Sequence, residues 1–327
     1  MTITYERVHT AKKRHMLRDM MEKTGRRVAK MANDTPRATS CQICASTALS
    51  HFAVAFGFDM RRCESCGLIF CDPYPSAEQI NAYYNSEMKE FENEFFRDSF
   101  EARVEIFAAR VDLICSAEPS GRLLDIGSAI GIFIESLRRA STLFEISACD
   151  LNVAACAELR GRFPGITVHN CDAADLDTDT KYDVITMWDT LEHVVDLPKM
   201  LATVRRLLRT DGLFVFSTPN THSFEWLVAG NRHIQILPPG HVNLMNTSSI
   251  AVLLERNGFR IEEQQTLNAS LDISYVENLL REDETVAART DAFLKHVIAD
   301  PVYQAMLSDY LVTNRMAGNV VTLARPT

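Results

Sequence analysis

The fold is decided by the stretch Leu123-Leu-Asp-Ile-Gly-Ser-Ala-Ile-Gly131, a short apolar run that ends in an acid and enters a glycine-rich turn. An amphipathic segment follows at 132–139 and predicts a helix. Glycines in such a turn let the backbone approach a ligand and leave free amides at the start of the helix. The turn differs from a dinucleotide fingerprint, because Asp125 ends the strand and Ala129 replaces a glycine. A carboxylate there disfavours a pyrophosphate and favours a ligand that carries a positive charge.

From residue 122 onward, short apolar runs alternate with helical stretches, which is typical of βα units. The expected strands lie at 123–126, 144–149, 166–169, 182–188, 213–216, 260–264 and 319–325. A helix at 197–209 begins after Asp196 and ends at Asp211-Gly212. We therefore expect an α/β fold, with a Rossmann-like, seven-stranded and mostly parallel sheet and helices on both faces.

Three carboxylates stand at the ends of successive strands: Asp125, Asp150 and Asp172. Asp150 is placed to accept hydrogen bonds from both hydroxyls of a ribose, a geometry that serves NAD as well. Asp172 is placed to accept from an adenine amino group. Each acid alone could instead be a helix N-cap or a solvated loop residue. Together they indicate an adenosyl ligand without phosphate.

Four of the nine cysteines form two C-x-x-C pairs, Cys41 with Cys44 and Cys63 with Cys66. Two such turns offer four thiolates to one ion, which suits a structural Zn²⁺ with no open coordination site. Reduced buried cysteines or a redox pair are the alternative. Redox pairing is disfavoured, because it needs a single C-x-x-C near a βαβ unit.

The chain has 327 residues and a formal net charge of -9, which argues against binding to nucleic acid. No apolar run approaches the roughly 18 residues of a membrane span, and no signal peptide is evident. We expect a cytoplasmic protein. Residues 1–40 are basic, and we interpret them as a solvated helix, with an anionic partner as the alternative.

The chain divides by composition into six expected segments. They are a basic N-terminal helical extension (1–40), a zinc-ribbon-like module (41–75), a helical linker or cap (76–118), the catalytic core (119–267), a helical insertion (268–317) and the last strand with the C-terminus (318–327). The insertion is expected to be a lid or a dimer contact, so a homodimer is one expected state.

The motifs together resemble the class I S-adenosylmethionine-dependent methyltransferases. The resemblance rests on Leu123–Gly131, Asp150, Asp172, Trp188–His193 and Ser217–Asn220. It is closer to a branch with an N-terminal zinc module and a Tyr-Tyr segment such as Tyr83-Tyr84, which includes deoxysugar C-methyltransferases and relatives in glycan and natural-product pathways. Pro238–Met245 and Gly258-Phe259 also fit, and the likeness covers about 41–265. Ala129 departs from the branch's three glycines, and its sugar C-methyltransferases have a longer C-terminal half.

The resemblance implies S-adenosylmethionine as cofactor and a set of residues that bind it. These are Asp125, Gly127, Ser128, Ala129, Gly131, Asp150, Leu151, Asp172, Ala173 and Trp188. His193 follows the fourth strand and is the first candidate base, and His241 is the second. Either histidine could instead only hydrogen-bond a loop. Tyr84, His222 and Glu192 are expected at the acceptor pocket, with Glu192 orienting a neighbouring loop.

The expected activity is methyl transfer to a small molecule such as a sugar, a glycan precursor or a natural-product intermediate. Oxygen is narrowly preferred as the acceptor atom, and C- or N-methylation of a nucleotide-linked deoxysugar is the alternative. A nucleic-acid or protein methyltransferase is disfavoured by the acidic charge and by Asp189-Thr-Leu-Glu192 in place of an Asn-Pro-Pro-Tyr run. A phosphate-binding dehydrogenase is less favoured still. An inactive zinc-containing scaffold protein remains the alternative from another class.

Overall fold

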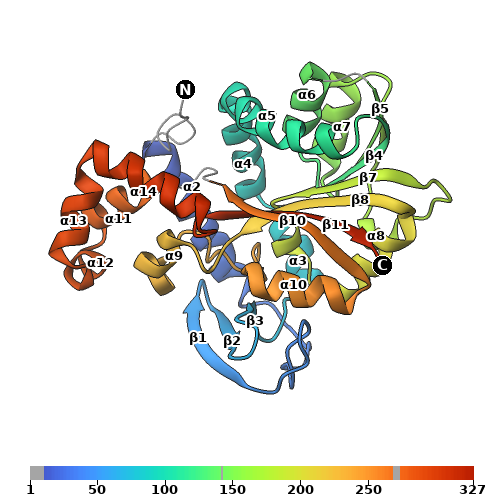
Figure 1. Cartoon of the computed structure of the whole chain (residues 1–327). Coiled ribbons are helices and arrows are strands. Elements are labelled where there is room, and N and C mark those ends of the chain that lie inside the picture. The colour runs from blue at the N-terminus through green and yellow to red at the C-terminus, as the bar shows by residue number, and fades with distance from the viewer. Residues whose placement is uncertain (1–10, 141–142, 268–272) are drawn as a thin grey trace.

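The computed structural model describes residues 11–140, 143–267 and 273–327, and arranges them as two β-sheets with surrounding helices (Figure 1). The first ten residues of the expected N-terminal extension and the start of the expected insertion lie outside the described residues. Among the described helices, none is long and apolar enough to cross a membrane.

The larger sheet contains seven strands. They are β4 (Gly121–Ile126), β5 (Phe144–Cys149), β6 (Thr167–His169), β7 (Tyr182–Trp188), β8 (Leu208–Pro219), β10 (Phe259–Leu267) and β11 (Asn319–Pro326). Their spatial order is β10-β11-β8-β7-β4-β5-β6. The pairs among β4 to β8 are parallel, whereas β11 runs antiparallel to both β8 and β10. The predicted fold class is confirmed.

Helices cover both faces of this sheet. One face carries α5 (Phe100–Ala117), α6 (Ile132–Ala140) and α7 (Val153–Arg162), and the other carries α8 (Leu197–Leu207) and α10 (Thr247–Arg256). Successive residues of a strand point to opposite faces. Leu123 accordingly packs into the core beneath α5 and α6, and Leu124 packs into the core beneath α8 and α10. Both faces are buried, as a parallel sheet requires.

The helix expected at 197–209 ends earlier, because the polypeptide enters β8 at Leu208. Leu208 pairs with Tyr182 at the start of β7 and is buried. A register irregularity between Tyr182 and Val184 accommodates this early pairing. Asp211 and Gly212 therefore lie within the long strand rather than in a turn after the helix.

The smaller sheet has four strands, and one of them comes from the catalytic core. Its members are β1 (Leu49–Ala55), β2 (Phe58–Cys63), β3 (Ile69–Cys71) and β9 (Asn243–Leu244). Strand β9 pairs antiparallel with β3, Ile69 opposite Leu244. Side chains reinforce this junction, since Gln42 Nε2 donates to Asn243 Oδ1 at 3.1 Å and Asn246 Nδ2 donates to the Cys66 carbonyl at 3.2 Å. The cysteine-bearing segment is thus attached to the core by backbone pairing.

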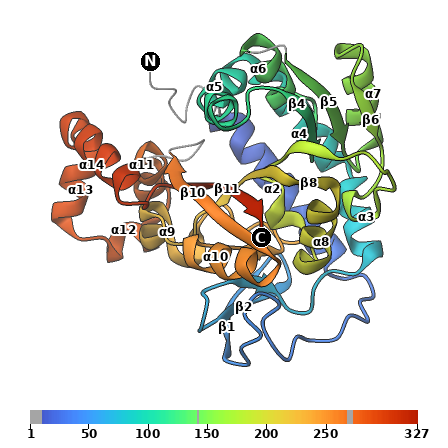
Figure 2. The same cartoon turned by 45° about the vertical axis from the view of Figure 1, so that its right-hand side comes forward.

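Three helices close one side of the molecule: α2 (Ala11–Val28), α3 (Ala77–Tyr84) and α4 (Glu87–Asp98). Helix α2 packs against both α3 and α4, as the turned view shows (Figure 2). Helices α3 and α4 are separated by Asn85 and Ser86. Ser76 caps α3 with a capping box, which fixes where that helix begins.

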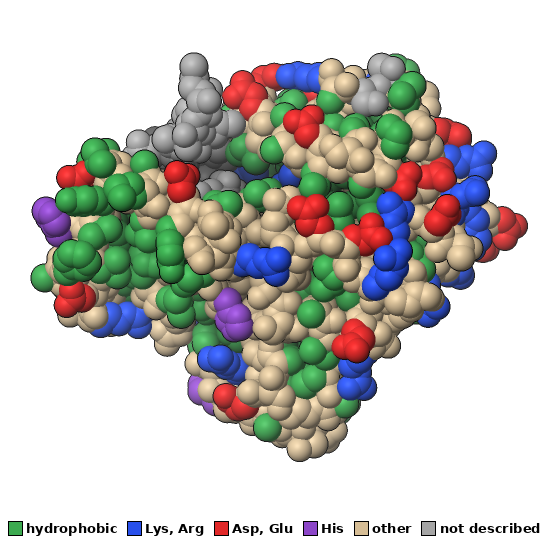
Figure 3. Space-filling model, in the orientation of Figure 1, with side chains coloured by type: hydrophobic (Ala, Val, Ile, Leu, Met, Phe, Trp, Pro, Cys, Tyr) green, Lys and Arg blue, Asp and Glu red, His purple; other side chains and the backbone are tan. Residues whose placement is uncertain are grey.

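A group of helices projects from the sheet edge near β10 (Figure 1). They are α9 (Phe224–Ala229), α11 (Ile273–Glu282), α12 (Glu284–Arg289), α13 (Ala292–Ala299) and α14 (Pro301–Thr313). Large apolar side chains are exposed on this group, and the space-filling view shows them as a patch on its surface (Figure 3). The exposed members are Leu227, Phe293, Val302, Tyr303, Met306 and Tyr310.

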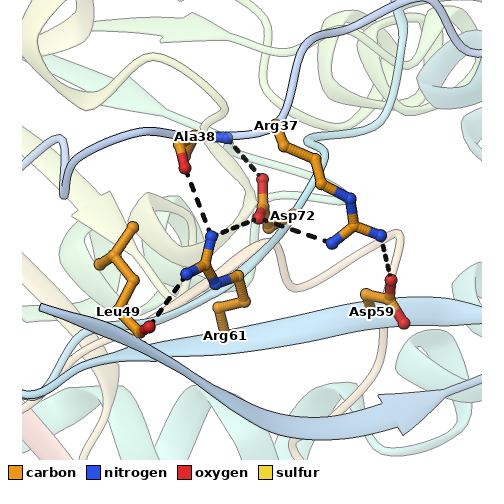
Figure 4. A network of polar contacts seen from close by, with 6 residues as sticks. All are labelled: Arg37, Ala38, Leu49, Asp59, Arg61 and Asp72. Atoms are coloured by element: carbon orange, nitrogen blue, oxygen red, sulfur yellow. Dashed lines mark hydrogen bonds and ion pairs between the residues drawn. The ribbon is translucent and has the colours of Figure 1, made fainter. Parts of the chain in front are cut away.

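A buried carboxylate holds the cysteine-bearing segment together (Figure 4). Asp72 has a fully buried side chain, accepts from the Ala38 amide at 2.7 Å and pairs with Arg61 at 3.0 Å. Arg61 also donates to the carbonyls of Ala38 and Leu49. The network therefore joins the chain before the first cysteine pair to β1, β2 and the end of β3.

Replacing Asp72 by Ala should lower the free energy of unfolding by about 3 kcal/mol, because it leaves a mostly buried arginine without its counter-charge. The matched control is Asp59→Ala. That carboxylate is 37% exposed and pairs only with the more exposed Arg37, so about 1 kcal/mol or less should be lost. Denaturant unfolding measures both changes, and equal losses would contradict a special role for Asp72.

Candidate active site

A cavity of about 610 Å³ opens where β4, β5 and β7 end, within the size range of small-molecule sites. The sheet provides its floor, and the helical cap provides its cover, with Leu17 and Met21 from α2, Tyr84 from α3 and Phe96 from α4. Helices α3 and α4 belong to the expected linker or cap, whereas α2 belongs to the extension that was expected to be solvated and instead packs into a buried cluster. Nine of the ten predicted cofactor-binding residues line this cavity, all except Gly131.

The glycine-rich turn forms part of the cavity wall. Gly127 has φ +76°, and a Cβ there would lie 2.3 Å from the Thr190 hydroxyl, so only glycine fits. Ala129 also adopts a left-handed conformation, with φ +44°. Gly131 lies outside the lining, and a Cβ on it would collide with Phe163 and Leu159. Gly131 therefore serves the packing of α6 against α7, and its predicted contact with the cofactor stays a prediction.

Asp125 is a buried carboxylate at the end of β4. It is 2% exposed, and its Oδ1 accepts a hydrogen bond from the Thr186 hydroxyl at 2.7 Å. Burial raises the pKa of Asp125 to about 7, and the Thr186 hydrogen bond only partly offsets this. A cationic ligand group beside it would restore the ionised form.

The other two acids of the predicted trio also line the cavity, and both cap backbone turns. Asp150 accepts from the amides of Ala129 and Asn152, each at 2.8 Å. Burial raises the pKa of Asp150. Asp172 accepts from the Ala174 amide at 2.9 Å and caps the short helix η1 (Ala173–Asp175). Because a carboxylate has about four lone-pair positions, capping leaves acceptor capacity for a ligand.

Two histidines meet at the other end of the cavity. His193 lies in the short helix η2 (Leu191–His193), directly after β7, and His241 comes from the loop before β9. Their ring centroids are 4.8 Å apart, and the Tyr84 hydroxyl lies 3.1 Å from His193 Nδ1. Burial lowers the pKa of His193 and brings the pKa of His241 down to about 4. Both imidazoles are therefore neutral near pH 7.

Glu192 directly precedes His193 in η2 and also lines the cavity. It is 1% exposed, and its Oε2 has no hydrogen-bond partner among the described residues. Burial raises the pKa of Glu192 well above its usual range, and the nearby Asp189 raises it further. A buried polar atom without a partner is rare in native proteins and indicates a missing ligand or ion.

Two cationic residues of the cap also line the cavity, and the sequence analysis missed both. Lys89 forms an ion pair with Glu92 at 2.5 Å and lies 4.7 Å from the Tyr84 ring centroid. Arg103 stacks on Phe96 and donates through Nε to Ser99, and no described carboxylate forms an ion pair with it. Burial lowers the pKa of Arg103 to about 10, so it remains charged. Only the folding of the cap over the cavity shows their role, since no motif marks them.

His222 does not line the cavity, in contrast to its expected place in the acceptor pocket. It is exposed and lies beside Gly67 of the cysteine-bearing segment. The cause is local. Asn220 is buried and donates a hydrogen bond to the Ala317 carbonyl, and Ser223 caps α9. Because both of these positions are fixed, His222 between them faces outward. The described insertion residues, 273–317, are also absent from the lining, so the cavity offers no support for a lid.

The four predicted metal ligands lie together. The Sγ atoms of Cys41 and Cys66 are 3.6 Å apart, and those of Cys44 and Cys63 are 3.5 Å apart. A tetrahedron with Zn–S bonds of about 2.3 Å separates its sulfurs by about 3.8 Å. The four thiols therefore fit a zinc ion of the structural type, with every coordination position filled by the protein.

Comparison with known proteins gives consistent matches over the core. Residues 100–264 match a family described as a methyltransferase domain. A probable S-adenosylmethionine-dependent methyltransferase of Mycolicibacterium smegmatis is 30% identical over 115 residues, which cover 35% of this chain but only 43% of that protein. A ubiquinone biosynthesis O-methyltransferase of Colwellia psychrerythraea is 26% identical over 179 residues, covering 47% of this chain and 72% of the relative. The solved structure of a mitomycin 7-O-methyltransferase shares the fold, with TM-score 0.50, 13% identity and coverage of 74% and 58%.

The buried state of Asp125 predicts a pH-dependent stability. Its pKa in the folded protein lies above the value of about 4 in an unfolded chain, so the folded state binds more protons and loses stability as pH rises from about 4 to about 7. Asp125→Asn removes this loss. Relative to wild type, the variant should gain up to about 4 kcal/mol above pH 7 and nothing near pH 4. Thermal unfolding across this range measures the difference, and a gain independent of pH would contradict the assignment.

Proposed function

Because this chain belongs to the family of S-adenosylmethionine-dependent methyltransferases, we propose that it transfers a methyl group from S-adenosylmethionine to a small hydroxylated molecule. The observation that carries the proposal is the single cavity that the cofactor carboxylates and the two histidines share. It has an acidic, glycine-rich end suited to an adenosyl ligand and an end with neutral bases suited to an acceptor.

Four charged residues each bind a different part of the cofactor. Asp150 receives the ribose hydroxyls, and Asp172 lies at the adenine end. Asp125 receives the ammonium group of the methionine moiety, since a cation favours the ionised form of this buried acid. Arg103 receives the methionine carboxylate, because it is charged, lines the cavity and has no carboxylate partner of its own among the described residues.

The histidines act on the acceptor. Bound S-adenosylmethionine supplies a methyl carbon already activated by a sulfonium, so the protein needs to align the acceptor and remove its proton. The hydrogen bond from His193 Nδ1 to the Gly240 carbonyl, at 2.8 Å, places the proton on Nδ1, so that Nε2 carries the lone pair of the neutral ring. His241 is fixed in the same way by the Gln235 carbonyl at 2.9 Å. Tyr84 and Glu192 line the same end of the cavity.

The acceptor is a sugar, a glycan precursor or a natural-product intermediate, and oxygen is the preferred atom because a neutral imidazole suits a hydroxyl proton. C- or N-methylation of a nucleotide-linked deoxysugar is the second candidate, favoured by the Tyr83-Tyr84 segment and the cysteine module. An inactive scaffold would have no need for the cavity-lining acids, and titration with S-adenosylhomocysteine separates it from an enzyme. In this proposal the zinc at the four cysteines is structural.

Replacing Asp150 by Ala should weaken S-adenosylhomocysteine binding at least tenfold. The ribose hydroxyls lose their hydrogen-bond acceptor, and the Ala129 amide loses the carboxylate to which it donates. Isothermal titration calorimetry measures the affinity. Asp175→Ala is the matched control, since that exposed acid pairs with Lys199 and does not line the cavity. Undiminished affinity in the Asp150 variant would remove it from the ribose site.

Replacing His193 by Ala should lower turnover at least 100-fold and change S-adenosylhomocysteine affinity less than threefold, because the imidazole acts on the acceptor alone. The assay follows S-adenosylhomocysteine release with the acceptor found by screening hydroxylated sugars and natural products. His222→Ala, outside the cavity, should retain full activity. Wild-type turnover in the His193 variant would exclude it from the reaction.

A further inference from the structure

Glu192, His193 and His241 form a second cluster of metal-ligating groups, separate from the cysteines. One ligand atom from each lies within 4.8 Å of the others. Glu192 and His193 follow β7, and His241 arrives from a loop 48 residues later that packs against them through the bond from the Val242 amide to the Glu192 carbonyl. Three donors from two distant segments therefore converge at the acceptor end of the cavity.

Both histidines are oriented as metal ligands usually are. Each donates its Nδ1 proton to a backbone carbonyl, His193 to Gly240 and His241 to Gln235. A carbonyl can only accept, so the proton stays on Nδ1 and the Nε2 lone pair is available to an ion. Such outer hydrogen bonds fix the ring and the tautomer of a metal-binding histidine.

Glu192 provides independent support for a bound cation at this cluster. Its side chain is buried, its Oε2 has no partner at hydrogen-bond distance among the described residues, and no described lysine or arginine forms an ion pair with it. Lys89, a cation of the same cavity, is already paired with Glu92. A carboxylate in this position is expensive to ionise alone, and a bound cation removes the penalty.

We propose that Glu192, His193 and His241 bind one divalent transition-metal ion that takes the acceptor's hydroxyl as a further ligand. Two imidazoles and one carboxylate form a three-ligand site of the type that leaves coordination positions open, unlike the closed four-thiolate site. Donors about 2.1 Å from a common ion lie at most about 4.2 Å apart, so a small side-chain rotation completes the site.

This inference rests on the proposed function and changes how the acceptor is activated. The acceptor's O–H bond breaks on the metal and the proton leaves to solvent water. The oxygen then forms the new bond to the methyl carbon, and the C–S bond breaks with its electron pair kept by sulfur. His193 acts in this case through its ligand bond, so the loss of turnover in His193→Ala does not distinguish the two roles, and metal binding does.

The test is a Co²⁺ titration of the full-length, zinc-loaded protein, followed by visible absorption and calorimetry. Wild type should bind one Co²⁺ with ligand-field bands and no thiolate charge-transfer band. Glu192→Gln and His241→Ala should each weaken this binding at least tenfold, whereas the exposed control His222→Ala should match wild type. Equal Co²⁺ affinity in wild type and both cavity variants, or no binding outside the cysteines in wild type, would overturn the proposal.

S-adenosylhomocysteine binding, measured on the same samples, separates this proposal from the proposed function. The cavity variants should bind it within about threefold of wild type, which also shows that they are folded. If wild type binds S-adenosylhomocysteine but no cavity Co²⁺, the metal proposal fails and the methyltransferase proposal stands. If wild type binds Co²⁺ through the two histidines and Glu192 but no S-adenosylhomocysteine, the methyltransferase proposal fails.

Discussion

The short segment from Gly240 to Asn246 holds the molecule together, because its backbone bonds connect three separate parts. The Gly240 carbonyl orients His193, and the Val242 amide and carbonyl bind Glu192 and Cys71. Strand β9 then completes the smaller sheet, and Asn246 reaches the Cys66 carbonyl. The cysteine cluster, the histidine pair and the end of β7 are consequently fixed relative to one another by hydrogen bonds that a single run of residues makes.

The two ends of the cavity differ in the titratable groups that they present. At the sheet end, acids stand where strand ends and helix starts provide amides, so the backbone stabilises Asp150 and Asp172. At the other end, burial keeps His193 and His241 neutral. Lys89 and Arg103 enter from the cap, which places positive charge opposite the acids. Burial thus acts in opposite directions on the two kinds of group, because it raises the pKa of Asp125 and Asp150 and lowers the pKa of the two histidines.

The larger sheet could be predicted from sequence because its signals are local: β5 and β7 have the expected bounds, and the glycine turn lies where the motif puts it. The predictions from sequence fail where the role of a residue depends on a segment far away in the chain. Leu208 joins β8 because Tyr182 is available to pair with it. Gly131 is required for its close approach to Phe163, which lies in another helix unit. Strand β9 and the cap cations have no sequence signal, since each gains its role only through a partner far away in the chain.

The shared sheet has a consequence for how this protein could have diversified. A zinc ribbon joined by a flexible linker can be lost or exchanged between enzymes without affecting chemistry. Here the pairing of Ile69 with Leu244 makes the cysteine module a part of the wall that carries His241, three positions before that pair. The module is therefore not a separable cassette, because its strand β3 pairs with the segment that follows His241.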